Sequence, residues 1–248
     1  MQILIHLLSM TLLLTACRSK PMFNAEEYFD GPARQLAVAI QGNQLDKARS
    51  LVRQVDLNRV YRQDMTFIFW AIINQAKAGL ELLLQAGANP NYQDPDGSSP
   101  VAYVARASDQ DYLKILLRYK ADPNSRNGQS PATKEAVLGD RWQNVLYLLD
   151  HGADINAVDE DRVSLIMVCA GLNFFDKVAY LIDRGADILQ KNNNGGGLAL
   201  RVQEAHPNPG TENYKWQQIV RQKLIEKGVK FPVPRPWEQR QQGQGQHE

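Results

Sequence analysis

The chain has 248 residues, a length that allows one large domain or two small ones. Hydrophobic residues make up 44% of it and charged residues 22%, which is ordinary for a folded protein. The formal net charge of +1 gives no electrostatic reason to expect a nucleic-acid partner.

The first 16 residues predict a targeting segment. They read MQILIHLLSMTLLLTA and contain no Asp, Glu, Lys or Arg. This apolar run is shorter than the ~20 residues that a helix needs to span a bilayer, and it suits a secretory signal. The stretch Leu14-Thr15-Ala16-Cys17 resembles the bacterial lipobox, although the leader has only His6 where such leaders carry Lys or Arg. The alternative is an ordinary signal peptide with a chance cysteine.

The lipobox resemblance implies cleavage before Cys17 and attachment of lipid to that residue, so that residues 1–16 are a lipoprotein signal peptide. Several acyl chains on one residue anchor a protein firmly. Arg18 stands where an Asp favours retention in the inner membrane, so the resemblance implies a periplasmic protein on the outer rather than the inner membrane. Residues 17–30 show no clean period, and we expect a lipidated tether there.

Two ladders of residues share one period in the next part of the chain. The first ladder has spacings of 33, 33, 32 and 33 residues, and the second consists of apolar pairs at about the same distance. A period in this range indicates a solenoid of stacked units. The ladders are Asp56, Asn89, Asp122, Asp154 and Asp187, and Leu51-Val52, Leu83-Leu84, Leu116-Leu117, Leu148-Leu149 and Leu181-Ile182.

The units resemble ankyrin repeats. Four of these units have a helix start at the place where that family has Thr-Pro-Leu-His. These starts are TFIFWA at Thr66, SPVAYV at Ser99, SPATKEA at Ser130 and SLIMVCA at Ser164. The resemblance implies an all-α ankyrin-repeat solenoid of about six helix-turn-helix units with short β-turn loops over residues 31–231. The family's histidine helps tie successive turns together, so its replacement implies weaker or different bonding there. The replacing residues are Phe69, Ala102, Thr133 and Met167.

Glycines mark the ends of the second helices. Gly87, Gly152 and Gly185 stand where the chain must turn left-handed and a Cβ would be strained. Lys120 takes that place in the third unit, and we expect a strained or altered cap there.

The sixth unit differs from the others in an insertion, HPNPGTEN, and in a long second helix. The insertion and helix suit either a terminal cap or a binding element. Residues 232–248 are rich in Pro and Gln and predict a flexible tail, with docking of Trp237 on the last repeat as the alternative for that residue.

The sequence contains no convincing catalytic or metal-binding constellation. Of the four histidines, His6 lies in the leader and His247 in the tail. His151 precedes Gly152 at a helix end, where a cationic side chain is favourable, and His206 has no Cys or second His beside it at metal spacing. Cys169 lies in the apolar run SLIMVCAG, which predicts a buried free thiol. We therefore expect no enzyme activity, no cofactor and no metal.

Binding is the remaining function, because a curved solenoid offers a long concave surface built from turn tips and first helices. Tyr, Trp and Arg are enriched among residues that dominate binding energy. The candidate partner-binding residues are Tyr61, Arg62, Tyr92, Asp94, Asp96, Arg126, Asp159, Glu160, Asp161 and Arg162 at the turn tips, and Trp70, Tyr103 and Arg106 in the first helices.

For Trp70 and Tyr103 the alternative is packing between repeats, and for Trp142, at the start of a second helix, packing is the favoured interpretation.

A lipid-anchored periplasmic ankyrin protein resembles the immunity proteins of type VI secretion lipase effectors. The resemblance implies a toxin inhibitor, monomeric when unbound, that binds a phospholipase effector and occludes its active-site mouth. The alternative is a structural adaptor of the envelope without a toxin partner. A third option is a role in oxidative-stress defence, as implied by some periplasmic ankyrin proteins.

Overall fold

The computed structural model of the protein describes residues 23–238. The leader, Cys17 and the last part of the tail lie outside these residues, so the predictions made for them stay predictions. No helix within the described range is both long and apolar enough to cross a bilayer.

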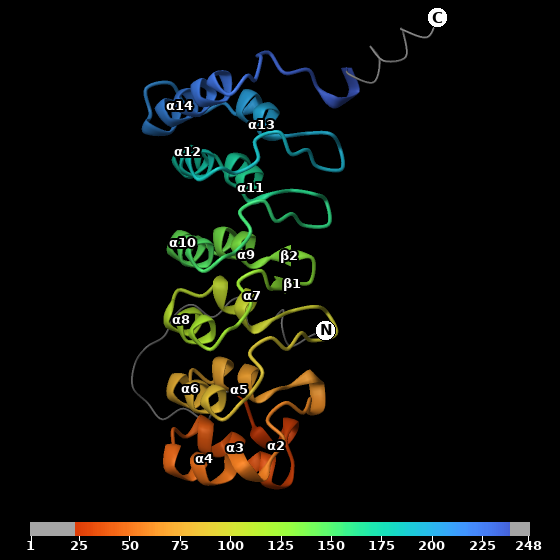
Figure 1. The fold of residues 1–248 in the computed structure, drawn as a ribbon, viewed down its shortest axis with the longest axis vertical. Helices are drawn as coiled ribbons and strands as arrows, with labels where there is room; N and C mark the ends of the chain where they lie inside the picture. Colours follow the sequence, from red (N-terminus) through yellow and green to blue (C-terminus); the bar gives the residue numbers. More distant parts are fainter. Residues whose placement is uncertain (1–22, 239–248) are drawn as a thin grey trace, which may run out of the picture.

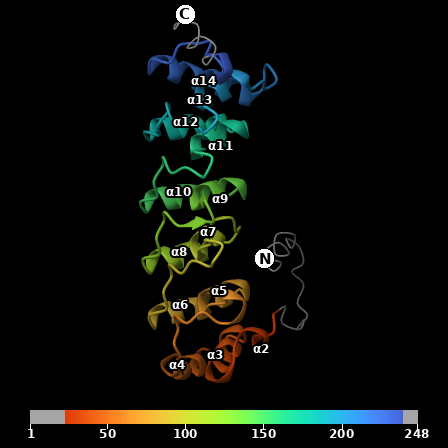
Figure 2. The same cartoon turned by 90° about the vertical axis from the view of Figure 1, so that its right-hand side faces the viewer.

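The described chain is a stack of six helix pairs along one long axis, joined by loops that all project to the same side (Figure 1). Each pair consists of a first helix and a second helix. The two kinds of helix form two parallel rows (Figure 2). The pairs are α3 (Gly31–Gln41) with α4 (Leu45–Leu51), α5 (Phe67–Ile73) with α6 (Lys77–Gln85), α7 (Pro100–Ala105) with α8 (Asp111–Arg118), α9 (Ala132–Leu138) with α10 (Trp142–Asp150), α11 (Leu165–Gly171) with α12 (Phe175–Asp183), and α13 (Leu198–Glu204) with α14 (Glu212–Glu226). The predicted all-α solenoid of about six units is thereby confirmed.

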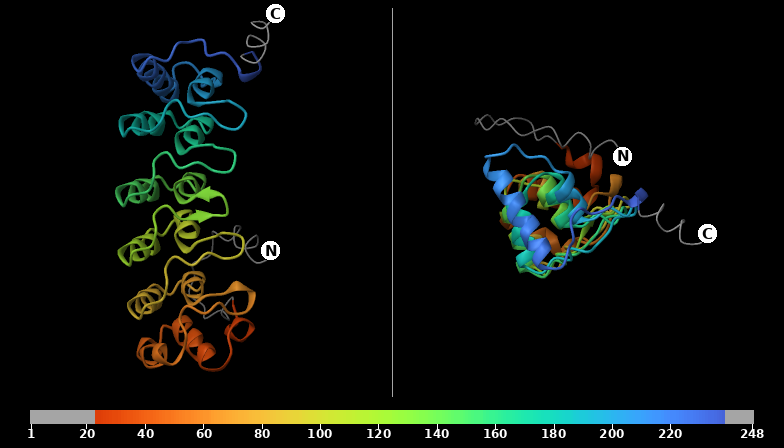
Figure 3. Two further views of the ribbon diagram at one scale, coloured as in Figure 1. Left: turned by 45° about the vertical axis from the view of Figure 1, so that its right-hand side comes forward. Right: turned by 90° about the horizontal axis from the view of Figure 1, so that it is seen from above.

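The connections between units form a row of fingers, defined here as residues 56–66, 89–99, 122–131, 154–164 and 187–197. Seen from above, successive units lie over one another and the fingers share one edge (Figure 3). The strands β1 (Arg126–Asn127) and β2 (Ser130–Pro131) pair antiparallel in the third finger of this row. Short pieces outside the pairs are α2 (Ala25–Tyr28), η2 (Val52–Gln54) and η3 (Arg62–Asp64).

Local chemistry explains where the helices begin. The side-chain hydroxyl of Thr66 accepts the N–H of Phe69 at 3.3 Å and caps α5. Ser99 caps α7 in the same way, and Pro100 follows it at the first helical position, where no N–H partner is needed.

The second helices end as predicted. Gly87, Gly152 and Gly185 have φ values of +95°, +94° and +85°. Lys120 holds the same left-handed region with φ of +63°, a conformation that is unfavourable for a residue with a Cβ. The prediction of a strained cap in the third unit is confirmed.

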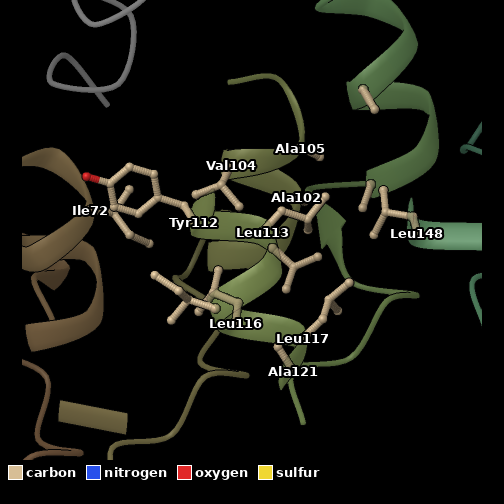
Figure 4. Close-up of a cluster of buried hydrophobic side chains, with 14 of the residues drawn as sticks. Ile72, Ala102, Val104, Ala105, Tyr112, Leu113, Leu116, Leu117, Ala121 and Leu148 are labelled. Carbon is tan, nitrogen blue, oxygen red and sulfur yellow. The ribbon is translucent and has the colours of Figure 1, made fainter. Parts of the chain in front are cut away.

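The core runs without interruption along the stack because each unit buries its apolar face against its neighbours. In the third unit, Leu113 and Leu116 of α8 are fully buried. Figure 4 shows them with Ile72 of the preceding unit on one side and Leu148 of the following unit on the other. A single unit could not bury these residues, so stacking supplies the stability.

The expected tether is wrong for residues 23–30, which pack against the first two units. Phe29 is 1% exposed, and its ring stacks on that of Phe67 with 4.9 Å between centroids. The guanidinium of Arg62 donates to the carbonyls of Glu26 at 2.7 Å and Phe29 at 2.9 Å, at the end of α2. Burial of aromatic side chains therefore fixes this segment in place, although its sequence shows no clear period.

The expected flexible tail is likewise wrong for residues 232–238. The backbone N–H of Val233 donates to the side chain of Gln203 at 2.6 Å, and that side chain donates back to the Val233 carbonyl at 3.0 Å. Arg235 donates to the carboxylate of Glu204 at 2.9 Å. The tail therefore lies across α13, while Trp237 stays 50% exposed.

Candidate protein-binding surface

The fingers and the first helices together form one face of the stack, called the inner face below. The finger side is visible at the right of Figure 1. Of the predicted binding residues, Tyr103 and Arg106 lie in or at the end of α7, and Trp70 lies in α5. The other predicted residues lie on fingers. The structure brings the set to one face but gives its members different roles.

Trp70 does not belong to the surface. Its side chain is fully buried, and its indole N–H donates to the carbonyl of Ala37 at 2.8 Å. The ring also contacts Tyr28 and Phe29, with centroids 5.6 and 5.3 Å away. The expectation that Trp70 contacts a partner is wrong, and the alternative of packing between repeats is confirmed: the indole bonds to the first unit, and residues 23–30 cover the ring.

Tyr61 and Arg62 have internal partners. The ring of Tyr61 lies 4.8 Å from Phe29 and 5.3 Å from Phe67, and burial raises the pKa of its phenol. The guanidinium of Arg62 donates hydrogen bonds to the carbonyls at the end of α2. Both residues hold the first finger against the N-terminal segment.

The second finger is shaped by Asp94. Its carboxylate accepts the N–H of Ser98 at 2.7 Å, and its own N–H donates to the Ser98 carbonyl at 3.0 Å. Tyr92 is half-buried, and burial, followed by the charges of Asp64 and Asp94, raises its pKa. Asp96 is exposed at the tip. Asp94 thus builds the turn, whereas Asp96 is presented to solvent.

Arg106 and Arg126 serve as ties between units. The guanidinium of Arg106 pairs with the buried carboxylate of Glu135 at 3.0 Å. That of Arg126 donates to the carbonyls of Gln129 at 2.6 Å and Val158 at 3.0 Å. Neither side chain is free to meet a partner without giving up these bonds.

Asp159 is held by a lysine of the preceding unit. Burial alone would raise its pKa, but the hydrogen bond from Lys134 and the N–H groups of Val163 and Asp161 outweigh burial and lower the pKa. Next to it, Glu160, Asp161 and Arg162 are exposed. Their side chains form no ion pair within residues 23–238.

Tyr103 is the aromatic residue of the set that remains on the surface of the first helices. Its half-buried ring meets Phe69 edge-on at 5.9 Å, and burial raises its pKa. The accessible part of the predicted set is therefore Tyr103, Tyr92, Asp96 and the tip of residues 160–162.

Sequence reasoning missed an asparagine ladder that ties each finger to the next. The side-chain oxygen of one asparagine accepts a backbone N–H from the following unit at 2.7 to 2.8 Å, in four successive junctions. These bonds supply the turn-to-turn bonding for which the family's histidine is missing. The signal was a period of about 33 residues, two positions after the Asp ladder. The residues are Asn58, Asn91, Asn124 and Asn156.

The ladder stops at the fifth position. Leu189 stands there, and its side chain is 72% exposed. The junction between the fifth and sixth units therefore lacks an asparagine rung of this kind.

The described residues contain little that could carry chemistry. No three of their His, Cys, Asp or Glu side chains are grouped to hold a metal ion. Cys169 is a fully buried free thiol, as predicted, and burial raises its pKa to about 12. His151 lies at the end of α10 with Nδ1 2.8 Å from the Tyr147 carbonyl. The arrangement can present a surface, and a repeat scaffold of this kind is typically used for binding.

Comparison with known proteins agrees with this geometry. The model of the family described as "Ankyrin repeats (3 copies)" matches residues 35–127 and 69–159. Protein PhlB of Serratia liquefaciens is 30% identical over 173 residues, which cover 68% of this chain and 76% of that protein. Neurogenic locus notch homolog protein 1 of Mus musculus is also 30% identical over 173 residues, but these are only 6% of its length.

Among solved structures, the ankyrin repeat domain of Bcl-3 is similar with a TM-score of 0.67 over 82% of this chain and 90% of that one. At 21% identity, that likeness concerns the fold. The stacked helix pairs, the fingers and the sequence matches lead to one conclusion: the chain belongs to the ankyrin-repeat family.

Proposed function

We propose that the protein is a periplasmic binding module, held at the outer membrane by lipid on Cys17, that binds and occludes a phospholipase effector of type VI secretion. Ankyrin repeats imply a protein partner in general. The finer proposal is supported by the lipobox-like stretch ending in Cys17 and by the resemblance of such a protein to immunity proteins.

The observation that carries the binding role is the accessible part of the inner face. Tyr103 supplies a ring already held by Phe69, and the tips at Asp96 and residues 160–162 supply charges without ion pairs inside the described chain. A ring fixed before binding loses little conformational entropy on contact. The core and the asparagine ladder keep these groups at fixed spacing. A partner bound to these groups would have part of its own surface covered by the protein. If that part includes the active-site mouth, the effector is occluded.

The anchor would raise the effective concentration of the inhibitor where the effector attacks phospholipid. A lipid-anchored module and its target would meet on one membrane. The anchor would have the same effect on any membrane-active partner, provided that lipid is attached to Cys17.

The test uses a phospholipase encoded beside the gene of this protein, where there is one, and the mature chain with Cys17→Ser. We expect equimolar addition to abolish phospholipid hydrolysis. Tyr103→Ala should weaken inhibition about 5- to 150-fold, the equivalent of ~1–3 kcal/mol. Tyr147→Ala, the same change at a half-buried tyrosine of a second helix, is the matched control.

The second candidate is an envelope adaptor without a toxin partner. It is favoured if no phospholipase gene is adjacent, or if the encoded enzyme is neither bound nor inhibited. For the anchor, Cys17→Ser should release the protein from the membrane fraction of its host. Continued fractionation with lipid would contradict the anchor while leaving the binding role untouched.

A further inference from the structure

The turns that join the first and second helix of each unit differ in character along the stack. These turns lie at the far end of the first helices from the fingers, because each first helix begins at a finger and ends at a turn. From the last residue of the first helix to the first residue of the second, the second unit reads INQAK (residues 73–77) and the third reads ARASDQD (residues 105–111). Over the same span the fourth and fifth units read LGDRW (residues 138–142) and GLNFF (residues 171–175), so that these two contain both a leucine and an aromatic residue.

Two leucines at these turns are exposed. Leu138 is the last residue of α9 and is 45% exposed, and Leu172 follows the last residue of α11 and is 42% exposed. A leucine left this open in water costs the free energy that its burial would provide. Exposed apolar groups that gather at one place indicate an interaction site.

The two leucines are directed toward each other across the junction of the units. Gly171 occupies the position in its helix that Leu138 occupies in α9, and a Cβ there would point at Arg201 of the following unit, 3.2 Å away. Gly139 occupies the position of Leu172, and a Cβ there would lie 2.9 Å from Arg106 of the preceding unit. By this equivalence Leu138 faces forward and Leu172 faces back.

Aromatic rings at the same two turns are held in place by their neighbours. Trp142 meets Tyr180 edge-on, with ring centroids 5.7 Å apart. The ammonium of Lys177 lies 3.9 Å from the centroid of Phe174 and 5.7 Å from that of Trp142. We call the group of Leu138, Arg141, Trp142, Leu172, Phe174 and Lys177 the turn patch.

The cations of the turn patch lack anionic partners. Within the described residues, Lys177 forms no ion pair with a carboxylate. The Nε of Arg141 is buried without a hydrogen-bond partner, and its Nη1 reaches only the carbonyl of Asp140 at 3.2 Å. A buried donor without an acceptor is costly, and an acceptor supplied by a ligand would remove that cost.

We propose that the turn patch is a second protein-binding surface, which takes a segment with an apolar side chain next to an Asp or Glu. The apolar side chain would pack on the exposed parts of Leu138 and Leu172, and the carboxylate would meet Lys177 and Arg141. This surface is separate from the inner face and does not depend on the function proposed above.

An anionic membrane is a poorer occupant of the same patch. Asp140 and Asp176 are exposed at the same two turns and would face the charged headgroups. A single carboxylate of a peptide can be placed on Lys177 away from both of them, whereas a continuous anionic surface cannot avoid them.

The test selects random linear peptides displayed on phage against the mature full chain with Cys17→Ser, and counter-selects on the Leu138→Ser, Leu172→Ser double variant. We expect the retained peptides to place Leu, Ile or Phe beside Asp or Glu. A synthesised member should bind the double variant at least about tenfold more weakly than the parent. Lys177→Gln should weaken it about fivefold and reduce the dependence of binding on salt.

The matched control is the Val38→Ser, Leu189→Ser double variant, which removes two other exposed apolar side chains and should bind as the parent does. Circular dichroism of each variant checks that the fold is kept. Tyr103→Ala should also bind the peptide normally, so that a failure of the inner-face proposal remains distinguishable. Retained peptides without a carboxylate, or affinity independent of Leu138 and Leu172, would overturn the proposal. The proposal would also be overturned if the parent protein sedimented with phosphatidylglycerol vesicles and the double variant did not.

Discussion

The side-chain oxygen of Asn124 accepts the backbone N–H of Asp154, in the following unit, at 2.7 Å. The amide nitrogen of the same side chain donates to the carbonyl of Gly152 at 3.2 Å. One asparagine thus bonds to two backbone groups of its neighbour. The stability of a solenoid is approximately the sum of the intrinsic stabilities of its units and the free energies of the contacts between neighbouring units. Each such rung therefore contributes directly to the coupling of one unit to the next.

Replacement of Asn124 by Ala should lower the free energy of unfolding by about 1–2 kcal/mol, because two hydrogen bonds are lost and their backbone partners are left to water. Urea denaturation followed by circular dichroism measures the change. Gln129→Ala, at an exposed position of the same finger, should change stability by less than about 0.5 kcal/mol. Equal effects of the two substitutions would show that the rung does not couple the units.

Replacement of Arg62 by Ala should release the N-terminal segment, because this side chain bonds to three carbonyls at the end of α2. Hydrogen exchange should then accelerate in residues 24–30 and leave α9 to α12 unchanged. Arg59→Ala, at a neighbouring arginine that lies over the ring of Tyr61, serves as the comparison. Unaltered exchange in the segment would mean that aromatic packing alone holds it.

Replacement of Lys120 by Gly should raise stability by about 0.5–1 kcal/mol. The left-handed φ of +63° strains a residue with a Cβ, and the gain is reduced by the greater freedom of Gly in the unfolded chain. Thermal unfolding measures the difference. The opposite result is expected for Lys114→Gly inside α8, which should cost about 1 kcal/mol. A destabilised Lys120→Gly protein would contradict the strain.

The pair of Asp159 and Lys134 should make stability depend on pH. The folded-state pKa of Asp159 is lowered, so its contribution is present above the ordinary value of 3.8 and is lost as pH falls through the lowered folded value. Asp159→Asn should therefore destabilise the protein at neutral pH and have a smaller effect in acid. Urea midpoints of parent and variant across this range give the comparison. A difference independent of pH would assign the effect to the turn's hydrogen bonds alone.

Cys169 should resist thiol reagents in the folded protein. Its side chain is fully buried and burial raises its pKa to about 12, so thiolate is scarce and inaccessible. In the Cys17→Ser chain, the reaction with a chromogenic disulfide should proceed at the rate of unfolding. Rapid labelling under native conditions, with circular dichroism unchanged, would contradict the burial.

The repeat could be predicted from the sequence because its signals are local. Gly87, Gly152 and Gly185 each mark a left-handed turn by residue type alone, and Lys120 was recognised as the exception by its position. The roles of individual surface residues depend on contacts between distant segments. Trp70 and Tyr103 occupy similar positions in successive units, yet Trp70 is buried because residues 23–30 fold over it. Nothing near Trp70 in the sequence carries that information.

The turn patch could not be predicted from the sequence either, because it too depends on contacts between distant segments. The sequence did not single out Leu138 or Leu172, because the exposure of a leucine at the end of a first helix depends on how the neighbouring units pack around it. Arg62 was correctly placed on a finger, but its three carbonyl acceptors belong to a segment that shows no period.

The leucine at position 189 leaves the fifth junction without an asparagine rung, and other contacts join the two units there. The long helix α14 packs along α12, and the ammonium of Lys223 in α14 pairs with the carboxylate of Asp183 in α12 at 2.6 Å. The strap from Val233 and Arg235 binds α13 within the last unit. Because each unit of a solenoid is stabilised by its neighbour, we expect the C-terminal module to unfold together with the unit before it and not to detach alone on mild heating.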